Sequence, residues 1–214
     1  YVFYTNGGIH RLASKDLKTW ERLDDCFSEM PKWINELIPT ARFDFWAPDI
    51  IYHDGLWHLF YACSAFGRNT SVIGHATSPT LDPKAKNYGW KDCGLIMQSV
   101  PTKTDWNAID PNVIFDENGD PWMDFGSFWG GIMMFKMKKD LSGPALPEEW
   151  HVLSTRPIPA QGKSTGGPVE APFTFKHGKY YYLFVSYGAL QAHGGYQIRV
   201  FRSDRPDGEY TDMN

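Results

Sequence analysis

The sequence has few cysteines and no basic run, and both features exclude classes of function. Its three cysteines, Cys26, Cys63 and Cys93, show neither a CxxC motif nor the Cys/His spacing of a zinc site. We expect buried free thiols, with one disulfide as the alternative in a secreted protein. The formal net charge of −4 provides no attraction for nucleic acid or an anionic membrane, so neither is an expected partner.

Other chemical signatures are also missing. The seven histidines form no HExxH or other ligand spacing, and Ser127 lacks the GxSxG context of a hydrolase nucleophile. The acids between positions 116 and 124 do not follow a calcium-loop pattern, and we expect all of them to lie near a solvent-facing hairpin turn: Asp116, Glu117, Asp120 and Asp124.

The sequence also contains no stretch that resembles a signal peptide or a membrane span of about 20 apolar residues. It opens with Tyr1-Val2-Phe3-Tyr4, which is typical of the middle of a strand. We therefore expect the natural N-terminus, and any targeting signal with it, to precede Tyr1.

Aromatic residues, glycine and proline are abundant, and they predict many short strands joined by tight turns. Four strand-like segments align with one another at a period near 60 residues: Val2 to Thr5, Leu59 to Ala62, Met123 to Ser127 and Tyr181 to Ser186. This period, with four short strands in each unit, predicts the blades of a β-propeller. The prediction is an all-β, single domain over residues 1–214, incomplete at both ends.

Each complete unit begins with a proline-marked strand, followed by a glycine-containing turn and two further strands. The opening strands are predicted at Ala47 to Tyr52, Asp110 to Phe115 and Ala171 to Phe175. The first unit lacks this strand, because Tyr1 already lies in the second. Residues 27–42 form an insertion before the second unit, and no long helix is expected.

Two acids, Asp110 and Glu170, lie at the start of successive predicted blades. The innermost strands of a propeller surround a common axis, so acids at their ends can converge. Paired carboxylates suit glycoside hydrolysis, which needs a protonated acid for the leaving oxygen and a base or nucleophile. The alternative is that each acid only caps a strand or turn. Asp49 follows its proline, while Ala47 is equivalent to Asp110, so Asp49 is predicted to be structural.

Aromatic rings in loops are the second feature expected of a sugar-binding site, since sugars present C–H faces that stack on aromatic planes. Trp46, Phe66 and Trp129 flank the predicted site strands, with core packing as the alternative for each. Arg199 lies inside the apolar segment Gln197 to Phe201, where an unpaired cation would be costly. It either faces solvent or pairs with an inner carboxylate or substrate hydroxyls, and we favour the second interpretation.

Four motifs in the same order along the chain resemble glycoside hydrolase family 43, most closely its endo-α-1,5-L-arabinanases. They are Phe45-Trp46-Ala47-Pro48-Asp49, Asn107-Ala108-Ile109-Asp110-Pro111-Asn112, Gly126-Ser127-Phe128-Trp129-Gly130-Gly131-Ile132 and Glu170-Ala171-Pro172-Phe173. Each motif is weak alone, but together they extend the resemblance over essentially the whole chain.

The resemblance implies a five-bladed β-propeller, about four blades of which are in this chain, and an inverting mechanism with three inner acids. By these motifs, Glu170 is the general acid, and Asp110 orients it and raises its pKa. Asn107 and Ser127 are expected to join Trp46, Phe66, Trp129 and Arg199 at the substrate. The general base, an Asp in a His-Asp-Pro-type motif, would precede Tyr1, and the fifth blade would follow Asn214.

We therefore expect a secreted, monomeric, inverting hydrolase that cleaves α-1,5-linked L-arabinan, with a polysaccharide or oligosaccharide substrate. The fragment itself is expected to need the missing general base for activity. No cofactor is required by the sequence, although the resemblance allows calcium. Two alternatives stay open: a non-catalytic carbohydrate-binding propeller, and an arabinofuranosidase or xylosidase on the same scaffold.

Overall fold

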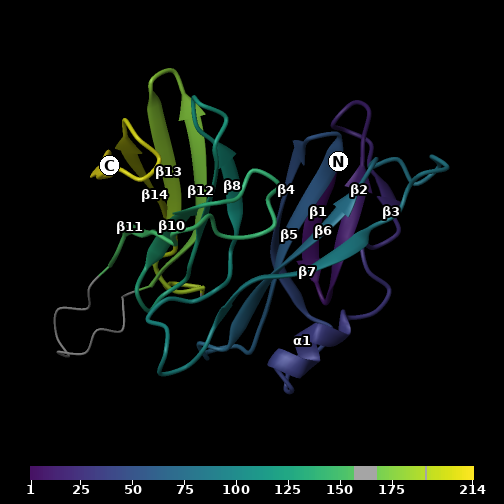
Figure 1. Cartoon of the computed structure of the whole chain (residues 1–214), viewed down its shortest axis with the longest axis horizontal. Coiled ribbons are helices and arrows are strands. Elements are labelled where there is room, and N and C mark those ends of the chain that lie inside the picture. The colour runs from purple at the N-terminus through teal and green to yellow at the C-terminus, as the bar shows by residue number, and fades with distance from the viewer. Residues whose placement is uncertain (157–167, 191) are drawn as a thin grey trace.

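The computed structural model describes residues 1–156, 168–190 and 192–214 (Figure 1). Its regular elements are almost all strands. In chain order they are β1 (Val2–Asn6), β2 (Gly8–Ala13), β3 (Glu21–Leu23), α1 (Lys32–Leu37), β4 (Phe45–His53), β5 (Leu56–Ser64), β6 (Ser71–Ser78), β7 (Lys91–Ser99), β8 (Asn112–Phe115), β9 (Pro121–Phe125), β10 (Ile132–Lys136), β11 (Trp150–Ser154), β12 (Val169–His177), β13 (Tyr180–Tyr187), β14 (Gln197–Ser203) and β15 (Thr211–Asp212).

The strands form sequential antiparallel sheets, which are the predicted blades. The sheets are β1-β2-β3, β4-β5-β6-β7, β8-β9-β10-β11 and β12-β13-β14-β15, so each blade pairs strands in chain order. Neighbouring blades contact one another through β1 and β4, β4 and β8, and β8 and β12. Figure 1 shows the purple first blade on one side and the green β12–β14 on the other. The propeller prediction is confirmed, and each proline-marked strand lies innermost in its blade.

The hairpins between the first and second strands of the blades form as the turn residues predict. At the tip of β4 and β5, Asp54 has φ 49° and Gly55 has φ 82°. Two consecutive residues with positive φ match the right-handed twist of the flanking strands, and glycine adopts this conformation without steric cost. The hairpin therefore fixes the register in which Ile50 pairs with Leu59.

Apolar side chains from adjacent blades fill the space between sheets. Phe60 and Ile73 of the second blade pack with Met123 and Phe125 of the third, and a separate cluster joins the third and fourth blades. The insertion at 27–42 contains the short helix α1, whose Ile34 is fully buried beside the first two blades. Burial of a Phe, Ile or Met side chain contributes about 1.5–3 kcal/mol. The packing between neighbouring blades therefore stabilises their arrangement.

A repeated kink marks the start of the innermost strands. Ala47, Asp110 and Ala171 each precede a proline and have φ values of 39°, 55° and 53°. Positive φ is uncommon outside glycine, and β4 and β12 both carry a bulge at this point. The kink turns the residues around it out of the strand ladder, toward the same end of the propeller in all three blades.

Side chains next to the kinks connect the blades. The Asp49 carboxylate accepts hydrogen bonds from the Val113 amide at 2.9 Å and from Asn112 Nδ2 at 3.2 Å. Asn112 Oδ1 in turn accepts one from the Thr174 amide at 2.9 Å. The prediction that Asp49 is structural agrees with these contacts, which join the innermost strands of the second, third and fourth blades.

The acids expected at a solvent-facing turn divide into two groups. Asp116 and Asp120 do lie at the β8–β9 hairpin, but Asp124 is fully buried and accepts a hydrogen bond from Thr174 Oγ1. The expectation for Asp124 was wrong because every residue of β9 is buried. The strand lies between two neighbouring blades, so both of its faces are covered. Burial raises the pKa of Asp124 to about 8.

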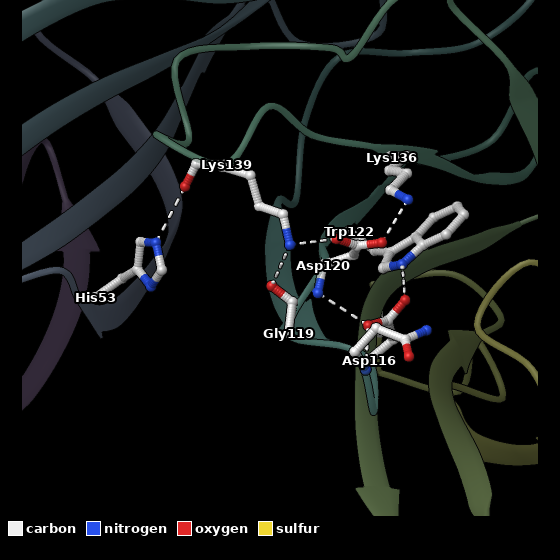
Figure 2. A network of polar contacts seen from close by, with 8 residues as sticks. His53, Asp116, Gly119, Asp120, Trp122, Lys136 and Lys139 are labelled. Carbon is white, nitrogen blue, oxygen red and sulfur yellow. Dashed lines mark hydrogen bonds and ion pairs between the residues drawn. The ribbon is translucent and has the colours of Figure 1, made fainter.

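The hairpin end of the third blade carries a polar network (Figure 2). Asp120 forms ion pairs with both Lys136 and Lys139. The Lys139 carbonyl accepts a hydrogen bond from His53 Nε2 at 3.0 Å, which connects this loop to the second blade. Asp116 accepts a hydrogen bond from Trp122 Nε1 at 3.1 Å. Asp116 and Asp120 at this end therefore have N–H or cationic partners.

All three cysteines are free, and Cys26 and Cys63 are buried as expected. Cys93 is exposed instead, because it lies on β7, the outermost strand of its blade. In the described ranges, the helix is too short and too polar to cross a membrane.

Candidate active site

One cavity of about 920 Å³ opens at the end of the propeller where the kinks lie. Its walls come from three blades and hold most of the predicted site residues. The lining residues are Trp46, Ser64, Ala65, Phe66, Gly67, Arg68, Asn107, Ile109, Asp110, Ser127, Phe128, Trp129, Glu170, Ala171, Ala189, Leu190 and Tyr196.

Asp110 and Glu170 converge at this cavity, as predicted from their repeat positions. Asp110 Oδ2 accepts a hydrogen bond from the amide of Ala171, the residue after Glu170, at 3.0 Å. Desolvation, and to a smaller extent the nearby charge of Glu170, raise the pKa of Asp110 from 3.8 to about 7. Asp110 can therefore hold a proton near neutral pH.

Two hydroxyl groups hold the Glu170 carboxylate. Ser127 Oγ donates to Oε2 at 3.0 Å, and Tyr196 Oη donates to Oε1 at 2.8 Å. Ser127, predicted to contact substrate, is buried and positions Glu170 from the third blade. Tyr196 was missed by the sequence analysis, since it belongs to none of the motifs. Burial and the bond to Glu170 raise the pKa of Tyr196 to about 12, so its hydroxyl keeps its proton.

The three predicted stacking residues all line the cavity. Phe66 is 87% exposed, and its ring lies edge-on to Trp46 with centroids 6.4 Å apart. Trp129 lies in a tight loop at 126–131, where a Cβ on Gly126 would come within 2.3 Å of the Gly131 carbonyl. Glycine is required there, because the backbone segments approach too closely for a side chain. The Trp129 ring is therefore presented to the cavity by a constrained loop.

Asn107 also lines the cavity while only 3% exposed. Its Oδ1 accepts a hydrogen bond from Ser71 Oγ at 2.6 Å. Leu190, which the sequence analysis did not single out, lies at the cavity and is 71% exposed.

The structure corrects the interpretation of Arg199. Its guanidinium pairs with Asp212 of β15 and lies over the Tyr187 ring at 5.9 Å. Asp212 is a carboxylate of the outermost strand, not an inner one, and Arg199 is not part of the cavity wall. The sequence indicates that this cation needs a partner, but which residue becomes the partner depends on the pairing of β14 with β15.

Among residues 1–156, 168–190 and 192–214, no group of three or more His, Cys, Asp or Glu side chains could hold a metal ion such as the calcium that the resemblance allows. The described residues therefore do not fit a metal site built from such a group.

A β-propeller cavity that holds two neighbouring acids and is lined by aromatic rings is typical of a glycoside hydrolase. The family model of glycosyl hydrolases family 43 matches residues 1–214. The chain belongs to this family, as its four motifs predict.

Two curated relatives show the range of activities among similar proteins. The chain is 43% identical to an extracellular exo-α-(1→5)-L-arabinofuranosidase of Cellvibrio japonicus, over 99% of this chain and 62% of that protein. It is 37% identical to an extracellular endo-α-(1→5)-L-arabinanase of Bacillus subtilis, over 97% of this chain and 61% of that protein. The chain thus spans about three-fifths of the length of these relatives.

Solved structures agree with the fold. A Cellvibrio cellulosa α-L-arabinanase superimposes with a TM-score of 0.93 at 42% identity, covering 100% of this chain and 69% of that one. The same enzyme complexed with arabinohexaose gives a TM-score of 0.92 at 41% identity, covering 100% of this chain and 71% of that one. These likenesses favour a hydrolase over a non-catalytic carbohydrate-binding propeller.

Proposed function

We propose that this chain forms the main part of the catalytic propeller of an inverting hydrolase that cleaves α-1,5-linked L-arabinan. The observation that carries the proposal is the convergence of Asp110 and Glu170 on one aromatic-lined cavity. Relatives named as acting on α-(1→5)-L-arabinan, and a neighbour complexed with arabinohexaose, support the choice of substrate.

In the proposed reaction, Glu170 donates its proton to the glycosidic oxygen as the bond to the anomeric carbon breaks. Ser127 and Tyr196 donate to the two oxygens of the carboxyl group and so fix its orientation at the cavity. Asp110 lies next to Glu170 and accepts a hydrogen bond from the amide of Ala171, the residue that follows Glu170. Asp110 is thus a positioning and electrostatic residue for Glu170.

A water molecule attacks the anomeric carbon from the opposite face, so the product has the inverted configuration. The resemblance assigns activation of this water to an aspartate outside residues 1–214. Trp46, Phe66 and Trp129 offer planes on which arabinose units can stack.

The test is Glu170→Gln in the whole protein that carries this chain, assayed on linear α-1,5-arabinan. Since glutamine cannot donate the proton, kcat should fall about 10²–10⁴-fold while the affinity for arabino-oligosaccharide is retained. The matched control is Glu149→Gln, which changes an exposed glutamate between β10 and β11. Unchanged turnover by Glu170→Gln would refute the assignment, and product NMR showing retained configuration would refute inversion.

The named relatives include an exo-acting and an endo-acting enzyme, and both are called extracellular. We accordingly propose a secreted enzyme and leave its mode of cleavage to product analysis. Release of single arabinose or of one short oligosaccharide from the start of the reaction indicates exo action, whereas a ladder of oligosaccharides indicates endo action.

A further inference from the structure

Three serines form a row across the cavity end of the second blade. Ser64 ends β5, Ser71 begins β6 and Ser99 ends β7. They are direct cross-strand partners, since Ser64 pairs with Ser71 and Ser71 pairs with Ser99. Their exposed fractions are 9%, 0% and 0%. A buried hydroxyl is costly unless it is hydrogen-bonded, so the partners of this row are informative.

The row ends on one atom of Asn107. Ser64 Oγ and Ser71 Oγ lie 2.6 Å apart, and Ser71 Oγ donates to Asn107 Oδ1 at 2.6 Å. Ser99 Oγ donates to the same Oδ1 at 3.4 Å and accepts a hydrogen bond from the Ala108 amide. Both lone pairs of the Asn107 carbonyl oxygen are thereby engaged inside the protein.

The nitrogen of the Asn107 amide, Nδ2, has different surroundings from the oxygen. Across the described residues, Nδ2 makes no hydrogen bond and is not among the buried polar atoms left without a partner, while Asn107 lines the cavity. An amide carries its two donors on nitrogen, so fixing Oδ1 also fixes where those donors point.

We propose that Ser71 and Ser99 are positioning residues that hold the Asn107 amide with Nδ2 toward the cavity, where it donates hydrogen bonds to an oxygen of the bound sugar. Asn107 then contributes to specificity, because a site built to donate to a sugar oxygen discriminates against ligands that lack it. This inference rests on the proposed function and adds a chemical role for Asn107 and a reason for the buried serines.

The first test is a double-mutant cycle on the affinity of the protein for a linear α-1,5-arabino-oligosaccharide, measured by calorimetry in the Glu170→Gln background. Ser71→Ala should weaken binding about 3–10-fold, and Asn107→Ala about tenfold. Adding Ser71→Ala to Asn107→Ala should change affinity by less than about twofold, because the serine acts through the amide. Additive losses in the cycle would overturn the proposal.

The matched control is Ser78→Ala. Ser78 lies at the opposite end of β6, is fully buried and donates to the Thr80 carbonyl at 2.7 Å. It should lower Tm as Ser71→Ala does but leave affinity unchanged. If Ser78→Ala weakens binding as much as Ser71→Ala, the effect is general destabilisation and the inference fails. Should Ser71→Ala not fold, Ser99→Ala supplies the same cycle with a smaller effect, because its bond is longer.

The second test is Asn107→Asp, which keeps an acceptor in place of Nδ2 but removes both donors. Binding should weaken at least tenfold, whereas an amide that used its oxygen toward the sugar would tolerate the change. Affinity equal to that of the parent protein would therefore overturn the inference. If the parent protein itself does not bind the oligosaccharide, it is the proposed function that fails.

Discussion

The two ends of the third blade carry carboxylates in opposite electrostatic settings. At the hairpin end, Asp120 contacts Lys136 and Lys139, whose hydrogen bonds and charges lower the pKa of Asp120 (Figure 2). At the cavity end, Asp110 is partly buried beside Glu170, and desolvation raises its pKa to about 7. The two side chains are chemically identical, but one has cations beside it and the other has an acid.

This contrast separates carboxylates that support the fold from those that can do chemistry. An ion-paired aspartate stays ionised through the neutral range and cannot exchange a proton there. A desolvated aspartate next to a second acid ionises less readily, so it can hold a proton near neutral pH. If the surroundings of each aspartate set its role, substitutions at the two ends of the blade should have unequal effects.

The largest effect is expected for Asp110→Asn. Loss of the carboxylate removes the like charge beside Glu170 and should lower kcat on arabinan about 10²–10³-fold. Asp120→Asn, the equivalent change at the hairpin end, should leave kcat unchanged. The measurement is steady-state kinetics of both variants, with circular dichroism to show that they fold. Equal losses in the two variants would remove the distinction between the ends.

A smaller loss is expected for Tyr196→Phe. Removing the hydroxyl takes away one of the two donors to Glu170, and a hydrogen bond to a charged group is worth about 1.5–3 kcal/mol. We expect kcat to fall about tenfold with little change in KM. Tyr182→Phe on the neighbouring strand β13 is the control, because Tyr182 makes no side-chain hydrogen bond in the described residues. A change in KM alone would assign Tyr196 to substrate binding instead.

The pH dependence of stability should reveal Asp124. Its folded-state pKa of about 8 exceeds the ordinary 3.8, so the neutral side chain stabilises the fold fully below about pH 4. This stability is lost as the pH rises through 8, since each pKa unit is worth about 1.4 kcal/mol. The Tm of Asp124→Asn relative to the parent should therefore increase by several degrees between pH 5 and pH 9. A constant difference would show that Asp124 is ionised when buried.

The smallest effect is expected when the lysine contacts are removed. Asp120→Asn should lower Tm by less than about 2 °C at low salt, because exposed ion pairs contribute little. In about 1 M NaCl the difference should nearly disappear, since the Debye length falls to about 3 Å. Thermal unfolding of both proteins at the two salt concentrations measures this difference in Tm. A large, salt-independent loss would show that the hairpin end depends on Asp120 through something other than charge.

The repeat in the sequence was sufficient to predict the blades and the meeting of Asp110 and Glu170. Three proline-marked strands at one spacing require that equivalent positions lie at the same end of the ring, whatever the sequence distance between them. The same reasoning placed Trp46, Phe66 and Trp129 at the cavity. Trp46 lies beside the proline of an inner strand, and Phe66 and Trp129 lie in the loops that follow the second strands of their blades.

Residues outside the repeat could not be placed in this way. Tyr196 reaches Glu170 from a loop of the fourth blade, and no local pattern indicates that contact. The burial of Asp124 depends on both neighbouring blades being present, whereas a single hairpin would leave one face open. Arg199 finds its partner only once the last strand pairs. In each case the decisive contact is set by tertiary structure rather than by local sequence.

The left-handed residue before each inner-strand proline makes the scaffold modular. Ala47, Asp110 and Ala171 share one backbone conformation, and only Asp110 carries a functional group there. Of the two alanines, Ala171 lines the same cavity as Asp110. An acid or an amide placed at Ala171 would therefore lie at this cavity without a new loop, and the chemistry of the site could be changed by exchanging one side chain.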